Sequence, residues 1–347
     1  MAKAVQADRE RERWMNHIFP GGFPALWCPP ITHYREDGSL DVERIEGHLA
    51  WMSGWVSGFL VPGSTSDGWE MSEDEEDQWV DLALRVAEEK GLFLWIGVLR
   101  GRGDEAAARI RQWMDRLAPG GAEDLMKRRI AGFAVCPPRG PGVTQDRVYD
   151  DLRQVAETGA PLCFYQIPQV TQSRVEPETL GRLIEEFGNV LALKDSSGED
   201  RCAASAEVRG HIRLMRGAEG DYLQWWAEAG GIYDGFLLST ANAFGEAYAR
   251  MFDAWRKGDK EAAQDLSRRL TAVMEKAFGL AQTLGVSNAF AAANKLIDHF
   301  YAHGPGAVEI SGPRVRGGQQ IPTLALEETG KVLREYGLLP ERGYWAK

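Results

Sequence analysis

The chain has 347 residues, of which 44% are hydrophobic and 26% are charged, as is typical of a water-soluble globular protein. Its 51 acidic and 40 basic residues give a net charge of −11, which argues against nucleic acid as a partner. No apolar run approaches the roughly 20 residues of a membrane span, and the N-terminus lacks the apolar core of a signal peptide. We therefore expect a cytoplasmic protein that does not bind membranes.

The four cysteines do not form a recognisable framework. Cys28, Cys136, Cys163 and Cys202 are widely separated, and no two of them have C-x-x-C spacing. This arrangement argues against a zinc cluster and against a set of disulfides. The acidic residues show no metal-ligand spacing and the six histidines are scattered, so we expect neither a metal nor another cofactor.

Short apolar runs alternate with longer amphipathic segments along most of the chain. Continuous hydrophobicity over a few residues is typical of parallel strands that are buried on both faces. Eight such runs are present, and they begin at Phe23, Gly58, Leu92, Gly132, Pro161, Val190, Arg213 and Gly235.

The segments between and after these runs have helical patterns of apolar residues. Ser72 and Glu75 form a capping box ahead of an apolar stripe, so a helix is expected to begin after Ser72. The other helices expected up to residue 255 are 41–55, 104–117, 145–157, 177–187, 220–229 and 243–255, with a shorter candidate at 200–209. Three further helices are expected at 259–284, 287–301 and 324–336.

Strands that alternate with helices predict a parallel sheet made of β-α-β units. Eight units favour an α/β fold of the closed (β/α)8 or TIM-barrel type, and a doubly wound open sheet is the alternative. That alternative usually has a glycine-rich loop after its first strand, whereas here the run ends in Cys28, Pro29 and Pro30. We expect three regions, with the last packed on the outside of the barrel: an N-terminal extension (1–21), a catalytic barrel (22–257) and a C-terminal helical region (258–347).

Lys194 is the first candidate for chemistry. Active sites of such barrels lie at the carboxyl ends of the strands, and Lys194 ends the sixth run after three apolar residues. A partly buried amine loses its proton more readily, because the charged form loses hydration, and a neutral amine can form a Schiff base with a carbonyl group. The alternative is that Lys194 extends to solvent or pairs with Asp195.

Two other strand ends carry groups that suit the same chemistry. Tyr165, in the fifth run, has a phenol that can relay protons to and from a carbinolamine, and packing alone is its alternative role. Gly63, Ser64 and Thr65 follow the second run, and their hydroxyls and backbone N–H groups can bind a carboxylate. An ordinary polar turn is the alternative there.

Further polar residues at strand ends could line a substrate pocket. Thr32 and His33 follow the first run, Arg139 follows the fourth, and Ser239 and Asn242 follow the eighth. Arg139 is a candidate for binding a carboxylate or a polyol, with a surface contact as the alternative. His33 could act as an acid or base, with a structural role as the alternative.

Four segments, in this order, resemble the pyruvate-dependent class I lyases typified by dihydrodipicolinate synthase and N-acetylneuraminate lyase. THYREDGSLD, from Thr32, is similar to the family's T-P-F-x-x-D-G-x-x-D, and GSTSDGWEMS, from Gly63, resembles its G-T-T-G-E turn. FYQIP, from Phe164, resembles Y-N-x-P, and LALKDSSG, from Leu191, resembles G-x-K-[DE]-x-[ST]-G. The resemblance spans about residues 22–255.

The resemblance implies roles for individual residues. Lys194 would be the Schiff-base lysine and Tyr165 the proton-relay tyrosine, while Ser64 and Thr65 would bind the pyruvyl carboxylate and continue the relay. Family barrels usually associate as dimers or tetramers, so we expect a homodimer or a homotetramer. The residues expected to shape the remaining pocket are Thr32, Gly63, Arg139, Gln166, Gly217, Ser239 and Asn242.

The chain departs from dihydrodipicolinate synthase where that enzyme binds its second substrate. The synthase has an arginine two residues after the proline of Y-N-x-P, whereas Pro168 is followed here by Gln, Val and Thr, and Pro138 and Arg139 replace its tyrosine pair. We therefore predict a Schiff-base aldolase or dehydratase for a small-molecule 2-keto acid (pyruvate or a 2-keto-3-deoxy acid), but not the lysine-pathway enzyme. The alternative is a non-catalytic, small-molecule-binding barrel of the same family.

Overall fold

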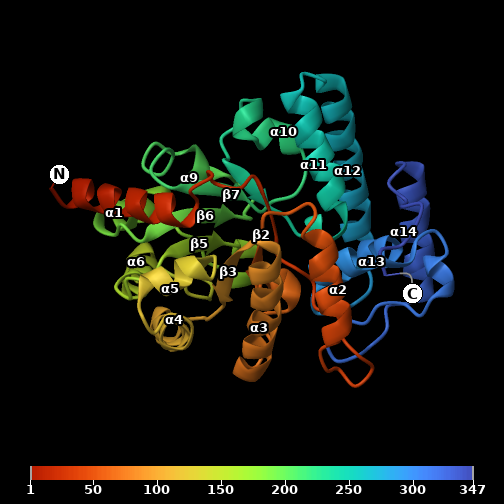
Figure 1. The fold of residues 1–347 in the computed structure, drawn as a ribbon, viewed down its shortest axis with the longest axis horizontal. Helices are drawn as coiled ribbons and strands as arrows, with labels where there is room; N and C mark the ends of the chain where they lie inside the picture. Colours follow the sequence, from red (N-terminus) through yellow and green to blue (C-terminus); the bar gives the residue numbers. More distant parts are fainter. Residues whose placement is uncertain (1, 346–347) are drawn as a thin grey trace.

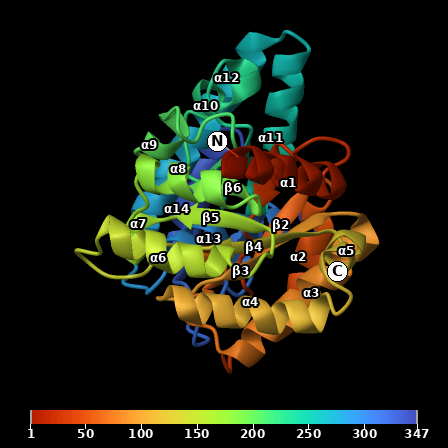
Figure 2. The ribbon, with the colours of Figure 1, turned by 90° about the vertical axis from the view of Figure 1, so that its left-hand side faces the viewer.

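The computed structural model describes residues 2–345, and its centre is a closed barrel of eight parallel strands that follow one another in chain order. The barrel confirms the predicted fold and excludes the open doubly wound sheet. Helices surround it in both views (Figures 1 and 2). Nearly every strand residue is buried, which explains the continuous apolar runs. The strands are β1 (Leu26–Cys28), β2 (Gly58–Val61), β3 (Phe93–Val98), β4 (Ile130–Val135), β5 (Leu162–Gln166), β6 (Val190–Asp195), β7 (Arg213–Arg216) and β8 (Gly235–Leu237).

The long helices that follow individual strands lie where the sequence pattern predicts them. The capping box is present: the backbone N–H of Glu75 donates to Ser72 Oγ at 3.3 Å, and the backbone N–H of Ser72 donates to the Glu75 carboxylate at 2.8 Å. These helices are α2 (Val42–Met52), α3 (Glu73–Lys90), α4 (Gly103–Leu117), α6 (Gln145–Ala156), α8 (Pro177–Glu186) and α11 (Ala241–Arg256).

The helices after β6 and β7 are much shorter than the pattern predicts. The second of them stops because Trp226 adopts an extended backbone, and its buried indole packs against Phe252 with ring centroids 4.5 Å apart. The sequence also left two short α-helices unpredicted, one of them in the loop over 118–129, together with the 3₁₀ turns η1 and η3. The short elements are α5 (Ala122–Lys127), α7 (Pro168–Thr171), α9 (Arg201–Ala204), α10 (Tyr222–Trp225), η1 (Ser64–Ser66), η2 (Ala227–Ala229) and η3 (Ala307–Glu309).

The N-terminal extension forms a helix, α1 (Ala2–Ile18), which packs against β6 and α8. The buried Arg11 donates from Nε to the carbonyl of Val190 at 2.8 Å. The Phe19 and Phe93 rings meet edge to face with centroids 4.9 Å apart. Since Val190 and Phe93 are the first residues of their strands, α1 and the residues after it cover the amino end of the barrel.

The C-terminal region consists of α12 (Lys260–Gln282), α13 (Ala289–His303) and α14 (Thr323–Glu335), which lie together on one side of the barrel (Figure 1). It packs beside the barrel through α11, as expected, but it also reaches the carboxyl ends of the strands, where α13 contacts η1 after β2. Within residues 2–345, no helix has both the length and the apolar composition that crossing a membrane requires.

Candidate active site

Lys194 in β6 lies directly beside Tyr165 in β5, because the parallel register pairs these two residues. Lys194 is 3% exposed, and its Nζ lies 3.9 Å from the centroid of the Tyr165 ring. The neighbouring Asp195 is also buried, and it accepts a hydrogen bond from the backbone N–H of Ser197 at 2.9 Å. No ion pair of Lys194 occurs within residues 2–345, so the lysine neither extends to solvent nor pairs with Asp195.

Three buried thiols lie close enough to Lys194 for its charge to affect their pKa values. Burial raises the pKa of Cys163 to about 12, and it raises the pKa values of Cys28 and Cys136 as well. In each case the effect of burial exceeds the opposing effect of the nearby Lys194 charge. The thiols therefore stay protonated at neutral pH and give the amine no thiolate partner.

The turn after β2 places Ser64 against the tyrosine. Tyr165 donates from its hydroxyl to Ser64 Oγ at 3.4 Å, and Trp69 Nε1 donates to the same oxygen at 3.0 Å. A serine hydroxyl that accepts two hydrogen bonds still has its own proton to donate. Lys194, Tyr165 and Ser64 therefore form a continuous row of groups that can hold or move a proton, with Thr65 beside them.

Glycines leave the space that this row requires. A Cβ on Gly217 would lie 2.8 Å from Lys194 Cε and 2.1 Å from Ser196 Oγ, so a larger residue there would displace the lysine. Gly63 begins the turn, and its backbone N–H donates to Ser66 Oγ at 3.1 Å.

A cavity of about 650 Å³ opens over Lys194 at the carboxyl end of the barrel. Seven of the residues singled out from the sequence line it: Ser64, Thr65, Arg139, Tyr165, Lys194, Gly217 and Ser239. Sequence reasoning missed other residues of the wall, namely Trp69, Glu70, Glu219, Met274, Phe278, Asn288 and Phe290. Trp69 stands in a segment that already resembled the family, whereas no motif signalled the residues from α12 and α13.

The other predicted site residues lie behind this wall. Thr32 Oγ1 donates to the carbonyl of Ser66 at 2.7 Å, and Gln166 Oε1 accepts a backbone N–H at 2.7 Å. The Asn242 amide accepts the backbone N–H of Ile31 at 2.9 Å and donates to a second backbone group of the same loop. These buried side chains hold the loops that form the cavity, as the backbone N–H of Gly63 does.

Glu219 lines the cavity, but its hydrogen-bonding capacity is used within the protein. Its Oε1 accepts from Ser239 Oγ at 2.9 Å and from the backbone N–H of Thr240 at 3.0 Å. Its Oε2 accepts from Thr240 Oγ1 at 2.7 Å and from the Tyr222 hydroxyl at 3.1 Å. A carboxylate offers about four acceptor positions, so all of them are occupied.

Asn288 ties the C-terminal region to the turn after β2. It caps α13, and its Nδ2 donates to the carbonyl of Ser64 at 2.8 Å and to Asp67 Oδ1 at 2.7 Å. The other oxygen of Asp67 accepts from the Tyr34 hydroxyl at 3.0 Å and lies 3.8 Å from Lys295 Nζ. The position of the turn therefore depends on residues more than 200 positions later in the chain.

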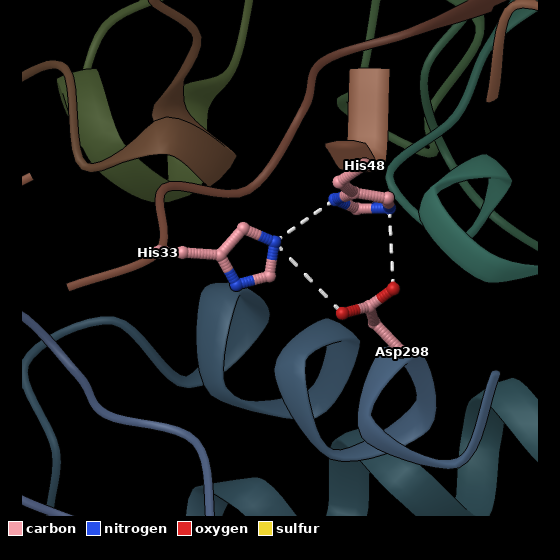
Figure 3. A group of neighbouring side chains, drawn as sticks. All are labelled: His33, His48 and Asp298. Carbon is pink, nitrogen blue, oxygen red and sulfur yellow. Dashed lines mark hydrogen bonds and ion pairs between the residues drawn. The ribbon is translucent and has the colours of Figure 1, made fainter. Parts of the chain in front are cut away.

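A second cluster of titratable groups lies where the β1 loop, α2 and α13 meet (Figure 3). His33 Nε2 is 3.0 Å from His48 Nδ1, and His48 Nε2 is 3.2 Å from Asp298 Oδ1. These three side chains bring possible metal-ligand atoms within 4.8 Å of one another. Asp298 already pairs with Arg44 and accepts from the Tyr344 hydroxyl, each at 2.7 Å, and the guanidinium charge opposes a dication.

We call this cluster, made of His33, Arg44, His48, Asp298 and Tyr344, the polar clasp. Burial lowers the pKa of both histidines, so they are neutral at neutral pH. The clasp joins the barrel to α13 and to the C-terminal tail. His33 does not line the cavity, so its role is structural and not that of an acid or base.

The fold and site together define a (β/α)8 barrel whose mouth holds a buried lysine against a tyrosine. The model of the dihydrodipicolinate synthetase family matches residues 23–296. The chain therefore belongs to this family, as the four sequence segments indicated.

Known proteins agree with this assignment. The chain is 30% identical over 244 residues to the 4-hydroxy-tetrahydrodipicolinate synthase of Xanthomonas campestris pv. campestris, covering 69% of this chain and 75% of that protein. Its fold matches a dihydrodipicolinate synthase from Thermotoga maritima with a TM-score of 0.71 at 20% identity, covering 91% and 99% of the two chains. It also matches a variant of the Sulfolobus solfataricus 2-keto-3-deoxygluconate aldolase with a TM-score of 0.69 at 14% identity, covering 90% and 96%. Family membership supports a lyase-type enzyme, and the structural matches confirm the fold.

Proposed function

We propose that the protein is a Schiff-base-forming lyase, an aldolase or a dehydratase, that acts on pyruvate or a 2-keto-3-deoxy acid. The observation that carries this proposal is the geometry of Lys194, which is buried, has no ion pair within residues 2–345 and lies 3.9 Å from the Tyr165 ring. An amine in this position can attack a carbonyl carbon, and the adjacent phenol can transfer the protons that the attack requires.

The reaction begins when Lys194 Nζ attacks the 2-keto carbon of the substrate. The carbinolamine loses water and becomes an iminium ion, with Tyr165 and Ser64 moving the proton. The substrate carboxylate lies against Ser64 and Thr65, where the Ser64 proton is free to bind it. The positive nitrogen then draws electrons from the neighbouring carbon, which loses a proton and becomes an enamine nucleophile.

The enamine has two productive outcomes. Its carbon can add to an aldehyde, and the reverse of this step cleaves a carbon–carbon bond. A 2-keto-3-deoxy acid can instead lose its 4-hydroxyl group as water from the same intermediate. The groups that line the rest of the cavity determine which outcome is faster, because they stabilise one transition state more than the other.

The composition of the cavity wall favours an aldehyde other than the one used in lysine biosynthesis. In the segment that follows Pro168, the cavity is lined by Gln169, Val170 and Gln172. This segment therefore offers no arginine to bind a second carboxylate. Apart from Lys194, Arg139 is the only cationic side chain among the described residues of the wall. We also propose a homodimer or homotetramer from the family resemblance, and a cytoplasmic location from the sequence pattern.

Reduction with borohydride in the presence of pyruvate tests the proposal. The intact mass is expected to rise by one reduced pyruvyl group, and peptide mapping is expected to place it on Lys194. Lys295→Met is the matched control, because Lys295 is a second buried lysine, 1% exposed, and this variant should still be labelled. Absence of an adduct, or an adduct on another lysine, contradicts the proposal, and stabilisation by pyruvate without an adduct favours a non-catalytic binding barrel.

A further inference from the structure

The cavity wall beyond Lys194 is largely apolar. Its apolar side chains include Trp69, Ile167, Val170, Met274, Phe278 and Phe290. They come from the turn after β2, from the segment after β5 and from the C-terminal helices. Pyruvate needs only the groups around Lys194, so these side chains face the space that remains for the second reactant.

Trp69 brings the edge of its indole next to Ser64. Its Nε1 donates to Ser64 Oγ at 3.0 Å, and this is the oxygen that accepts from the Tyr165 hydroxyl. The guanidinium of Arg139 lies 5.5 Å from the indole ring centroid. An aldehyde carbon held close to the enamine therefore has its substituent near the Trp69 indole.

Two phenylalanines extend this aromatic surface. The Phe278 and Phe290 rings meet edge to face with centroids 5.3 Å apart, and Phe290 is 46% exposed. Asn288, two residues before Phe290, bonds the carbonyl of Ser64, which holds the pair in place relative to the catalytic turn. A large apolar side chain exposed in a cavity gains stability when a ligand covers it, and aromatic ligands add edge or face contacts.

Three polar side chains of the wall are bonded to other parts of the protein. Glu219 accepts four hydrogen bonds. The Asn288 side-chain amide donates to the carbonyl of Ser64 and to the carboxylate of Asp67. Gln169 Nε2 donates to two backbone carbonyls. A substrate hydroxyl group placed against these three side chains would lose water without gaining a partner, which costs free energy.

We propose that the second reactant of this lyase is an aromatic aldehyde rather than a polyol or an acidic aldehyde; this inference rests on the proposed function. In the forward step the enamine carbon of the Lys194-bound pyruvyl group forms a bond to the aldehyde carbon. The aldehyde oxygen takes up a proton and becomes a hydroxyl group. The water released on imine formation is matched by the water that hydrolyses the product imine and frees a 4-aryl-4-hydroxy-2-keto acid.

The test compares aldehydes at a fixed, saturating pyruvate concentration, with product formation measured by chromatography. Benzaldehyde is expected to have a kcat/KM at least about tenfold above those of glyceraldehyde and succinic semialdehyde. Phe290→Ala is expected to lower the benzaldehyde-to-glyceraldehyde ratio of kcat/KM about tenfold, since it removes one aromatic contact. Ile310→Ala is the matched control: Ile310 is also 46% exposed but does not line the cavity, so the ratio should not change.

Trapping of pyruvate with borohydride separates the two ways in which the experiment could fail. If no adduct forms at Lys194, the proposed function itself is wrong. If the adduct forms but benzaldehyde fails to react, or glyceraldehyde or succinic semialdehyde is preferred, the assignment of an aromatic aldehyde is overturned while the Schiff-base chemistry stands. An unchanged ratio in Phe290→Ala also overturns it.

Discussion

Two buried lysines of this protein show how the same residue type acquires different roles. Lys194 in the barrel lies 3.9 Å from the Tyr165 ring centroid, and Lys295 in α13 lies 4.5 Å from that of Tyr34. Lys295 also donates to the carbonyl of Arg314 at 2.9 Å and lies 3.8 Å from Asp67. Lys194 has no such ion pair within the described residues and faces the cavity instead.

The difference lies in the partners, because burial and the aromatic neighbour are shared. A buried charge is costly, and partners reduce that cost; Lys295 has such partners, although the effect of burial on its pKa still exceeds theirs. Lys194 has no such partners within the described residues, so its amine remains available to a ligand. The polar clasp resembles Lys295 in this respect, since Asp298 is bonded to both Arg44 and Tyr344.

The largest effect is expected from removing the unpartnered lysine. Lys194→Ala should abolish both pyruvate trapping and turnover, because no other amine lines the cavity within the described residues. The melting temperature should change little, since Lys194 makes no ion pair within the described residues whose loss would destabilise the fold. Steady-state kinetics measure the turnover and thermal denaturation measures the melting temperature. Turnover at the wild-type rate would show that another residue is the nucleophile.

Tyr165→Phe tests whether the aromatic neighbour of Lys194 does more than pack. The ring contact remains, but the hydroxyl that donates to Ser64 is lost, so kcat should fall by about 10² or more with little change in pyruvate affinity. Tyr149→Phe, which removes an exposed hydroxyl bonded to Glu186 at 2.8 Å, is the control. Equal kcat values for Tyr165→Phe and Tyr149→Phe would show that Tyr165 only packs against Lys194.

Lys295 should affect stability rather than catalysis, and with a specific pH dependence. Burial lowers the pKa of Lys295 to about 8 from 10.5, so between these values the unfolded chain binds more protons than the folded protein. The free energy of unfolding of the wild type should therefore rise from pH 8 to pH 10 relative to Lys295→Met, by about 2–3 kcal/mol. Urea denaturation of both proteins measures this difference, and a difference that does not vary with pH would contradict it.

The polar clasp should make the protein less stable in acid. Burial lowers the pKa of His33 and of His48 below 6.5, so below pH 6.5 the unfolded chain takes up protons that the folded protein excludes. Stability should fall between pH 7.5 and 5.5 by about 1.4 kcal/mol for each histidine that stays neutral.

His48→Gln should reduce this pH dependence, whereas replacement of the exposed His211 by Asn should not. Denaturation curves at the two pH values measure both effects. Zinc or a chelator should leave the curves of the wild type unchanged, because Arg44 occupies Asp298. Strong stabilisation by zinc would show that the clasp is a metal site.

Much of the fold and of the candidate site could be predicted from the sequence, for a physical reason. Strands buried on both faces are continuous apolar runs, and in a closed barrel all strand ends meet at one rim. Residues as far apart in sequence as Ser64, Tyr165 and Lys194 can therefore be assigned to one site from the sequence alone. The capping box at Ser72 could also be predicted from the sequence, because it depends only on residues three positions apart.

Predictions were wrong where long-range packing overrides local pattern. The helical periodicity over 220–229 ends early in the structure, because the Trp226 indole packs against Phe252. Thr32, Gln166 and Asn242 were assigned to strand ends correctly, but their side chains bond the backbone behind the cavity wall. Polarity at a strand end indicates closeness to the site, whereas the direction of a side chain depends on its partners.

The sequence by itself determined the barrel, the family and the lysine that we propose as the nucleophile, since each depends on local periodicity or on short motifs. Only the tertiary structure decided that Lys194 is unpaired while Lys295 is paired, because an ion pair requires groups that are distant in sequence to meet. It also decided that Phe278, Asn288 and Phe290 form part of the cavity wall. The turn between α12 and α13 places them there, and the substrate that the site accepts depends on that placement.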